Sequence, residues 1–395
     1  MTVAAAPSRS SRVTIGIVAG EASGDALAAT LIRAVKERVP QARFVGIAGQ
    51  QMQAAGCEAW YPLEMLSVRG FVEVISRLPQ LVVLRRALYR RLRAERVPLF
   101  IGVDAPDFNL GLERKLKRAG LRSVHFVSPS VWAWRKERLR TIGRSVHRML
   151  TLFPFEPPLY ESAGIPVTFV GHPLAAEAAA LSSRREAREQ LKIGATQPVF
   201  ALLPGSRASE LDNHGELVLR AAEALLATRP DAQFLVPLAT RVTRDRFEAS
   251  IYRLGLDKLP LKLLYGHATD ALRAADVALV ASGTATLQAA LARCPHVIFY
   301  RVSRLTASIV KARMLLPYVG LPNILAGRFV VPEMLQEDAT ADNLALAAAN
   351  LYDDTVTRRR LEALFAGFAA SLSADTGRLA ADAVATELRA AGVAC

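Results

Sequence analysis

Residues 13–25 read VTIGIVAGEASGD, a short apolar run followed by a loop with two glycines, and residues 22–39 continue as an amphipathic helical pattern. A buried strand that leads directly into a helix is the repeating unit of a parallel α/β sheet. We expect this alternation to continue along the chain. The expected strands are 43–48, 99–104, 122–128, 146–153 and 167–171, and the expected helices are 71–96, interrupted at Pro79, and 111–119.

The alternation pauses at an alanine-rich helical linker that opens with His172-Pro173-Leu174, and it restarts after Pro198. From 339 onward the pattern is entirely helical. We therefore predict two Rossmann-like doubly wound domains, 1–172 and 173–338, and a helical tail, 339–395. The tail would pack back on the first domain or be exchanged in a dimer. This organisation resembles the GT-B architecture of glycosyltransferases, in which ligands bind at the carboxyl ends of the strands, in the cleft between the domains.

Composition limits the function classes. The 395 residues are 51% hydrophobic and 22% charged, as in a globular protein. Three distant cysteines and six histidines without metal-ligand spacing argue against a disulfide framework or a zinc site, and favour a reducing cytoplasm. No apolar stretch reaches the roughly 20 residues of a membrane span. The net charge of +14 indicates an anionic partner, although a GC-rich genome's preference for arginine is an alternative.

The loop at 20–25, GEASGD, follows the first expected strand. It differs from the GxGxxG pattern, and no acidic residue follows at the dinucleotide spacing, so NAD is disfavoured. Its glycines permit a tight turn before the free N–H groups of a helix. The substrate-binding candidates here are Glu21, Ser23, Gly24 and Asp25. The alternative is an ordinary loop in which Ser23 or Asp25 caps the helix.

The segment 102–109, GVDAPDFN, ends another expected strand. A carboxylate at this position can accept a proton from an attacking sugar hydroxyl. We favour Asp104 for this chemistry. The alternative for Asp107 and Asn109 is that they cap the next helix.

Two loops of the second domain are suited to a nucleotide diphosphate. In 202–207, LLPGSR, Gly205 permits close backbone approach and Arg207 supplies a bidentate cation, although a simple turn with a solvated arginine is an alternative. In 282–288, SGTATLQ, hydroxyls and N–H groups meet at a helix N-terminus, although a simple Ser/Thr cap is an alternative. We see no DxD-type cluster, so we expect neither a metal nor a cofactor. The candidates that would bind substrate here are Gly205, Ser206, Ser282, Gly283, Thr284, Ala285, Thr286 and Gln288.

Residues 66–84, LSVRGFVEVISRLPQLVVL, precede an arginine-rich helical face that continues to Arg96. Apolar side chains beside such a face suit an anionic bilayer surface, although a core helix with a solvated basic face is the alternative. Nucleic acid is not an expected partner, because aromatic residues make up 7% and no RNA-recognition or zinc-finger signature occurs. The candidate membrane contacts are Leu66, Val68, Phe71, Val72, Leu81, Val82, Arg85 and Arg86.

Nine segments in register resemble the lipid-A-disaccharide synthase family. They are AGEASGD (19–25), GVDAPDFN (102–109), SPSVWAWR (128–135), FPFE (153–156), FVGHPL (169–174), LPGSR (203–207), SGTATL (282–287), VGLPNILAGR (319–328) and VPEMLQ (331–336).

The resemblance implies an inverting GT-B glycosyltransferase, peripheral to the cytoplasmic face of the inner membrane and forming a homodimer. Its donor would be UDP-2,3-diacylglucosamine and its acceptor 2,3-diacylglucosamine 1-phosphate (lipid X). The products would be a β-1,6-linked disaccharide 1-phosphate and UDP. The family's essential residues fall on Asp104, Arg207 and Asn323, and Glu333 would help to hold the donor.

One position departs from the family pattern, since Gln288 stands where a glutamate often binds the donor ribose. Glutamine can still hydrogen-bond hydroxyls, but without a charge. Two other function classes compete. An isomerase of the UDP-N-acetylglucosamine 2-epimerase kind would share the two domains but would not need an apolar, arginine-flanked segment. A catalytically silent binding protein would not need Asp104, Arg207 and Asn323 together.

Overall fold

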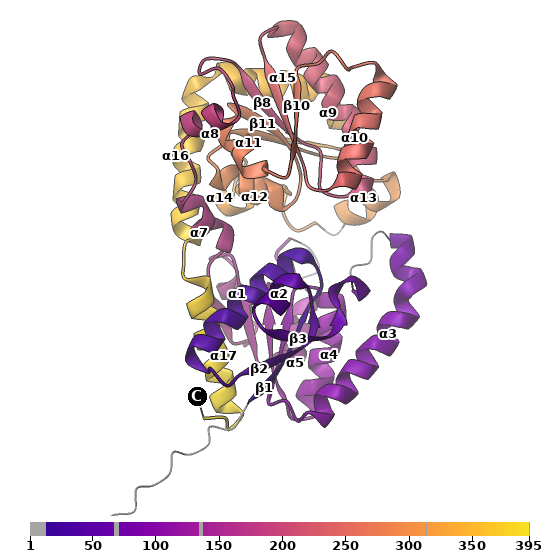
Figure 1. Ribbon diagram of the computed structural model, residues 1–395, viewed down its shortest axis with the longest axis vertical. Helices are drawn as coiled ribbons and strands as arrows, with labels where there is room; N and C mark the ends of the chain where they lie inside the picture. Colours follow the sequence, from indigo (N-terminus) through magenta and orange to yellow (C-terminus); the bar gives the residue numbers. More distant parts are fainter. Residues whose placement is uncertain (1–12, 67–70, 134–136, 313, 395) are drawn as a thin grey trace, which may run out of the picture. The chain divides into compact units, whose positions relative to one another are not determined.

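The computed structural model describes residues 13–66, 71–133, 137–312 and 314–394. Its contacts divide the chain into two compact units (Figure 1). Unit 1 comprises Met1–Pro173 and Leu372–Cys395, and unit 2 comprises Leu174–Ser371. Each unit is a parallel sheet with helices on both faces, so the expected doubly wound α/β fold is confirmed.

Unit 1 contains a seven-stranded sheet in the order β3-β2-β1-β4-β5-β6-β7. All its neighbouring strands are parallel. The strands are β1 Thr14–Ala19, β2 Arg43–Ala48, β3 Cys57–Pro62, β4 Leu99–Val103, β5 Arg122–Phe126, β6 Arg148–Thr151 and β7 Val167–Phe169. The helices are α1 Ala22–Arg38, α2 Gln50–Ala54, α3 Phe71–Ala94, α4 Pro106–Arg118, α5 Arg138–Ser145, α6 Pro157–Glu161 and α17 Thr376–Ala390.

The alternation of side chains along the strands explains the two covered faces. Ile15 and Ile17 of β1 pack with α1 and α17 on one face. Val18, from the same strand, packs with Phe100 and the leucines of α3 and α4 on the other. The predicted interruption at Pro79 is wrong, because α3 runs continuously from Phe71 to Ala94. A proline removes one backbone hydrogen bond, and the remaining bonds of a helix this long can still hold it together.

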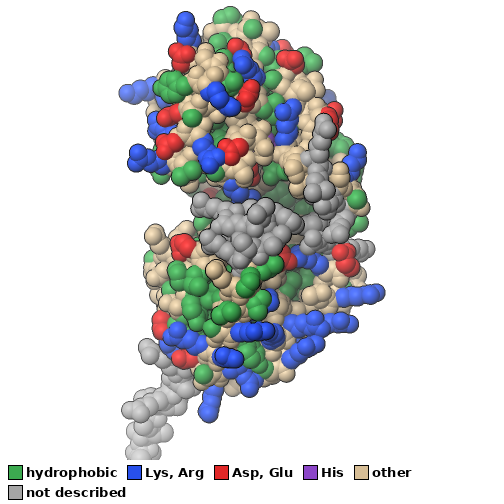
Figure 2. Space-filling model, turned by 90° about the vertical axis from the view of Figure 1, so that its right-hand side faces the viewer, with side chains coloured by type: hydrophobic (Ala, Val, Ile, Leu, Met, Phe, Trp, Pro, Cys, Tyr) green, Lys and Arg blue, Asp and Glu red, His purple; other side chains and the backbone are tan. Residues whose placement is uncertain are grey.

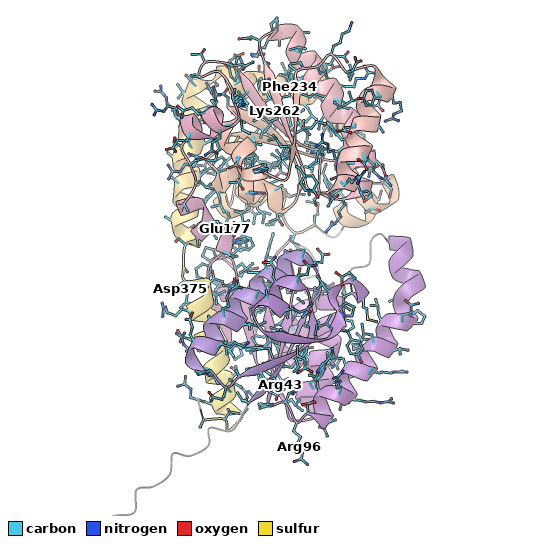
Figure 3. All side chains as sticks on the ribbon, in the orientation of Figure 1. Arg43, Arg96, Glu177, Phe234, Lys262 and Asp375 are labelled. Carbon is cyan, nitrogen blue, oxygen red and sulfur yellow. The ribbon has the colours of Figure 1, made fainter. Side chains whose placement is uncertain are left out.

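Unit 2 contains a six-stranded sheet in the order β10-β9-β8-β11-β12-β13. Phe234 lies in the core of its sheet (Figure 3). The strands are β8 Val199–Leu203, β9 Gln233–Leu238, β10 Leu261–Tyr265, β11 Val277–Ala281, β12 His296–Tyr300 and β13 Glu333–Leu335. The helices are α7 Pro173–Ala179, α8 Arg184–Gln190, α9 Ala208–Thr228, α10 Arg241–Leu254, α11 Ala268–Ala274, α12 Thr284–Leu291, α13 Arg304–Lys311, α14 Leu321–Ala326, α15 Ala341–Asp353 and α16 Thr355–Leu372.

The C-terminal helices are shared between the units. α15 packs against α9 in unit 2, whereas α17 packs against α1 in unit 1. Glu387 of α17 forms ion pairs with Arg122 of β5 and Arg148 of β6. The segment predicted as one helical tail, 339–395, therefore contributes to both units. Within the described ranges, no helix is both long enough and apolar enough to span a bilayer.

Candidate functional site

Two predicted loops of unit 1 meet at the carboxyl edge of its sheet. β1 and β4 are neighbours, with Ala19 in register with Val103, so the loops that follow them lie side by side. A Cβ atom added to Gly20 would lie 2.3 Å from the Cβ of Ala105, and one added to Gly24 would lie 3.8 Å from the Cβ of Asp104. The fold therefore brings the GEASGD loop against Asp104, and the glycines permit this approach.

Asp104 has an unusual backbone conformation. Its φ of 53° and the φ of 43° at Ala105 both lie in the left-handed region, which is sparsely populated by residues other than glycine. The Asp104 N–H donates to Phe126 O at 2.8 Å, and Asn109 Nδ2 donates to Asp104 O at 2.8 Å. No described residue forms a hydrogen bond or ion pair with the half-buried carboxylate, which leaves it available to a ligand.

Asp25, by contrast, uses its side chain to hold the backbone of a neighbouring loop and helix. Its buried carboxylate accepts hydrogen bonds from Gly49 N (2.9 Å), Gln51 N (2.9 Å) and Met52 N (3.2 Å). It therefore caps α2 rather than its own helix, whose N-cap residue is Glu21. Glu21 and Ser23 are exposed.

The capping alternative for the next loop is wrong, because Asp107 and Asn109 both lie inside α4 and the N-cap residue is Ala105. The side chain of Asp107 is 82% exposed and pairs with Arg138.

A buried polar pair that sequence reasoning missed lies behind Asp104. His125 Nδ1 lies 2.8 Å from Glu113 Oε1, and neither side chain is exposed. Burial raises the pKa of Glu113, although His125 opposes this shift. A Cβ on Gly102 would lie 2.2 Å from Glu113 Oε1, so the glycine in GVDAPDFN makes room for this carboxyl group. That glycine is the signal that could have revealed the pair.

Aromatic side chains gather around a second buried acid in unit 1. The ring centroid of Phe155 lies 5.3 Å from that of Trp132 and 5.4 Å from that of Phe153. Glu156 accepts hydrogen bonds from Trp132 Nε1 (3.0 Å), Leu152 N (3.2 Å) and Phe153 N (3.0 Å). Burial raises the pKa of Glu156 to about 7. This carboxyl group therefore ties the SPSVW loop after β5 to the FPFE turn after β6.

In unit 2, the two predicted phosphate loops follow neighbouring strands, since Leu203 of β8 is in register with Val280 of β11. In the first loop, Glu210 accepts hydrogen bonds from Ser206 N at 2.8 Å and Arg207 N at 3.1 Å. These amides already have an acceptor. The Arg207 side chain is 61% exposed, with Glu210 at 3.7 Å, so its guanidinium can still contact a ligand.

The second loop exposes Gly283 and Thr284 at the start of α12. The capping alternative is wrong, because the N-cap residue is Gly283 and no side chain caps the helix. Thr286 Oγ1 instead donates to Gly283 O at 2.8 Å and accepts from Leu321 N at 3.3 Å. Ser282 and Ala285 are half-buried. Gln288 Nε2 donates to Thr269 Oγ1 at 2.7 Å.

Asn323 is fully buried, and both polar atoms of its side chain are hydrogen bonded. Its Oδ1 accepts from Val330 N (2.7 Å) and Val331 N (3.0 Å), and its Nδ2 donates to Val331 O (3.0 Å) and Glu333 Oε1 (2.8 Å). Glu333 also accepts from Val319 N at 2.9 Å and Gly320 N at 2.8 Å. The two residues together join α14 to β13.

His214 of α9, which sequence reasoning also missed, links two loops of unit 2. It donates from Nδ1 to Pro204 O at 2.9 Å and accepts from Arg301 N at 3.1 Å. It therefore ties the LPGSR loop to the end of β12, and no motif in the sequence signals this contact.

The predicted membrane contacts lie before and along α3. Leu66 is half-buried against the core that contains Leu84 and Leu88. Leu81, Val82 and Arg85 are half-buried, and Arg86 is exposed. Val68 lies outside the described residues, and the side chains of Phe71 and Val72 are likewise outside them.

Comparison with known proteins shows similarity along nearly the whole chain. The family model described as lipid-A-disaccharide synthetase matches residues 15–382. The lipid-A-disaccharide synthase of Chromobacterium violaceum is 52% identical over 376 residues, covering 95% of this chain and 97% of that protein.

Solved structures with low sequence identity share the fold. The glycosyltransferase of kitacinnamycin has a TM-score of 0.60 at 17% identity, covering 96% of this chain and 100% of that one. The UDP-GlcNAc 2-epimerase of Neisseria meningitidis, solved bound to UDP-GlcNAc, has a TM-score of 0.57 at 12% identity, covering 95% and 99%.

Proposed function

The chain belongs to the lipid-A-disaccharide synthetase family, and on that premise we propose that it joins UDP-2,3-diacylglucosamine to 2,3-diacylglucosamine 1-phosphate (lipid X). The enzyme is a glycosyltransferase of lipid A disaccharide synthesis, with a UDP-sugar donor and a lipid acceptor. The proposed products are the β-1,6-linked disaccharide 1-phosphate and UDP, formed with inversion at the anomeric carbon.

The observation that carries the proposed mechanism is the half-buried carboxylate of Asp104, which has no partner among the described residues and lies at the carboxyl edge of the sheet in unit 1. Asp104, or a base that it orients, removes the proton of the acceptor 6-hydroxyl. The acceptor oxygen then bonds to the donor anomeric carbon, and the bond from that carbon to UDP breaks. The proton resides on the base, and the departing diphosphate carries the released electron pair.

Arg207 and the N-terminus of α12 are proposed to stabilise the departing UDP. An exposed guanidinium and the helix end that begins at Thr284 both attract negative charge. Gly205, Ser206 and residues 282–286 belong to the two loops that follow the neighbouring strands β8 and β11, and they are proposed to contact the diphosphate. The backbone amides of Ser206 and Arg207 already donate hydrogen bonds to the Glu210 carboxylate. The side chain of Arg207 is therefore the more important donor in this proposal.

We assign positioning roles to Asn323, Glu333 and Asp25. Their hydrogen bonds to backbone groups support this role, because groups occupied in this way hold the loops that contact substrate. Gln288 is proposed to contact the donor ribose. The acylated substrates, the apolar stretch of α3 and the net charge of +14 support work at the cytoplasmic surface of the inner membrane, and a homodimer is proposed from the family.

Incubation of the purified protein with UDP-2,3-diacylglucosamine and lipid X in mild detergent with EDTA tests this function. We expect the disaccharide by mass spectrometry, with one UDP released for each product formed. Epimerisation of UDP-N-acetylglucosamine without disaccharide formation would instead favour the isomerase, to which the fold alone gives support. Product that forms only when a divalent ion is restored would contradict the metal-independent mechanism.

A further inference from the structure

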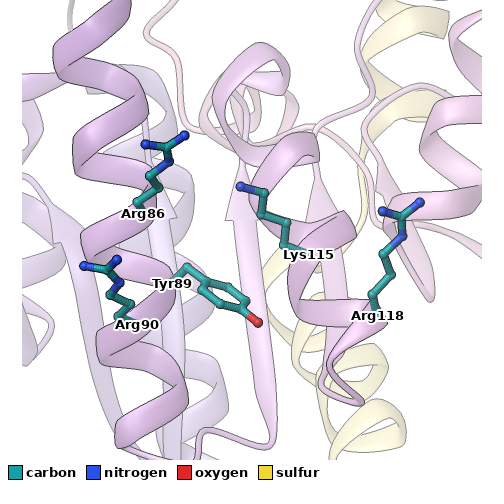
Figure 4. Close-up of a pocket in the computed structure, with 5 residues that line it drawn as sticks. All are labelled: Arg86, Tyr89, Arg90, Lys115 and Arg118. Carbon is teal, nitrogen blue, oxygen red and sulfur yellow. The ribbon is translucent and has the colours of Figure 1, made fainter.

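A groove between α3 and α4 of unit 1 is lined almost entirely by basic side chains. It has a volume of about 410 Å³ and is lined by Arg86, Tyr89 and Arg90 of α3 and by Lys115 and Arg118 of α4. Figure 4 shows the Tyr89 side chain extending from α3 toward α4, and the Lys115 side chain extending from α4 toward α3. The groove therefore presents four cations and one phenol hydroxyl to a common space.

Within the described ranges of the chain, none of these four cations forms an ion pair or a side-chain hydrogen bond. Arg43 of the same unit shows the contrast, because it pairs with Glu58 at 2.6 Å and Glu95 at 3.0 Å. Like charges that share a groove repel one another, and a bound anion would relieve this repulsion. Arginine and lysine with a hydroxyl donor make a donor set suited to phosphate oxygens.

The groove lies away from the proposed catalytic edge. Asp104 precedes α4, whereas Arg118 ends it, roughly 18 Å along the helix from Pro106 at 1.5 Å per residue. The groove is therefore separate from the edge at which we place the acceptor 6-hydroxyl. Another phosphate-bearing molecule must be considered.

The surface of α3 next to the groove indicates which molecule this is. Leu78, Val82, Arg86 and Arg90 follow one another at four-residue spacing, so they lie along one stripe of the helix. The side chain of Leu78 is 48% exposed, and the neighbouring Val83 is 63% exposed. Figure 2, which views the side of the molecule where α3 lies, shows Lys and Arg side chains gathered on unit 1 beside apolar ones.

We propose that the α3–α4 groove binds the phosphate of an anionic phospholipid headgroup, while the apolar stretch of α3 contacts the acyl region beside it. The exposed Val83, within one turn of Arg86, and the exposed Leu78, about two turns away, favour a lipid over free phosphate or nucleic acid, since neither of those buries apolar surface. This inference rests on the proposed work at the membrane surface. It adds a lipid site that is separate from both substrates.

Vesicle co-sedimentation without any sugar substrate tests the site, so its result does not depend on disaccharide formation. The wild type is compared with R90Q/R118Q, which removes one exposed cation from each side of the groove. The control R359Q/R360Q removes two exposed cations from α16 in unit 2. Vesicles contain phosphatidylcholine with or without phosphatidylglycerol. Thermal unfolding verifies that each variant is folded, and removing like charges should not lower the melting temperature of R90Q/R118Q.

For two cations, at about 1 kcal/mol each, we expect binding of R90Q/R118Q to phosphatidylglycerol vesicles to weaken roughly 30-fold. The control should bind nearly as the wild type does. Equal weakening in both variants would mean that only total charge matters and would overturn the site. Calorimetry with inorganic phosphate separates the sources. Phosphate binding that depends on the groove, together with unchanged vesicle binding by R90Q/R118Q, would overturn the lipid assignment.

Discussion

At the residue scale, Asp104 and Ala105 hold left-handed torsions that cost on the order of 1–3 kcal/mol each. Two hydrogen bonds hold this turn in place. Asn109 Nδ2 donates one to Asp104 O, and the Asp104 N–H donates the other to Phe126 O. Strain of this kind is retained where it aims a functional group. Asparagine tolerates the same torsions, so it removes the carboxylate charge without disturbing the turn.

For Asp104→Asn we therefore expect turnover to fall roughly 10²–10⁴-fold, the usual contribution of a general base, with UDP affinity unchanged. UDP release measures turnover, and titration calorimetry measures UDP affinity. The matched control is Asp107→Asn, three residues away on an 82% exposed side chain, which should keep most activity. An Asp104→Asn enzyme with near-normal kcat would remove Asp104 from the chemistry.

Glu156 predicts a dependence of stability on pH. Its pKa is about 7 in the folded protein, above its ordinary value of 4.5. Between these values the folded state binds more protons than the unfolded state, so the free energy of unfolding falls as pH rises. Burial of His172 lowers its pKa to about 4 and gives the opposite slope. This second contribution cancels when the wild type is compared with Glu156→Gln.

Between pH 5 and pH 8 we expect Glu156 to reduce the free energy of unfolding of the wild type by about 2–3 kcal/mol. Urea denaturation at several pH values measures this, and the decline should be absent from Glu156→Gln. Gln cannot accept hydrogen bonds at both of its terminal atoms, so the variant should also be less stable at pH 5. Parallel pH profiles for the two proteins would show that Glu156 does not titrate in this range.

At the element scale, Asn323 and Glu333 join α14 to the short edge strand β13 through hydrogen bonds to Val330 N, Val331 N and Gly320 N. A buried polar group that loses its partner costs about 1–3 kcal/mol. These contacts make Asn323 a residue that stabilises the segment from Val319 to Val331, which includes α14.

We expect Asn323→Ala to lower the free energy of unfolding by about 2–4 kcal/mol, because two backbone amides and one Glu333 oxygen lose a partner. Chemical denaturation measures the stability loss, and any loss of activity should accompany it. Gln288→Ala, which breaks one contact to Thr269, is a milder control in the same unit. A fully stable Asn323→Ala variant without activity would instead indicate direct contact between Asn323 and substrate.

Much of this element-scale structure could be predicted, and the limits have physical causes. Apolar runs such as 199–203 predict buried strands. The edge strand β13 has three half-buried residues and no such run. The position of Asp104 in a loop after a strand was predictable from the sequence. The approach of this loop to Gly24 was not, because it depends on β1 pairing with β4, which chain order alone does not specify. The contacts of Asp25 to Gly49 and of His214 to Arg301 depend on tertiary structure in the same way.

At the scale of the whole molecule, the first and last parts of the chain form one unit. Ala380, Val384 and Leu388 of α17 lie in the core of unit 1 with the strands near the N-terminus. All three tryptophans, Trp60, Trp132 and Trp134, belong to the first 173 residues. Tryptophan fluorescence is therefore a probe of unit 1.

We expect Leu388→Ala to lower the free energy of unfolding, as measured by tryptophan fluorescence, by about 2–5 kcal/mol, because Leu388 is fully buried in the core of unit 1. Urea unfolding followed by fluorescence measures it. Leu346→Ala, a 61% exposed leucine of α15 in unit 2, should leave the fluorescence transition unchanged. A shift of similar size in both variants would mean that the two units unfold together.

The return of α17 to unit 1 also fixes an order of events on the ribosome. Unit 2 is an insertion of 198 residues, 174 to 371, between the two parts of unit 1. At about 5–20 residues per second, translation of this insertion takes roughly 10–40 s. Throughout that time the nascent first unit exposes the apolar face that α17 will cover. The unit whose synthesis starts first therefore cannot be completed until α17 has been made, and until then this apolar face stays uncovered.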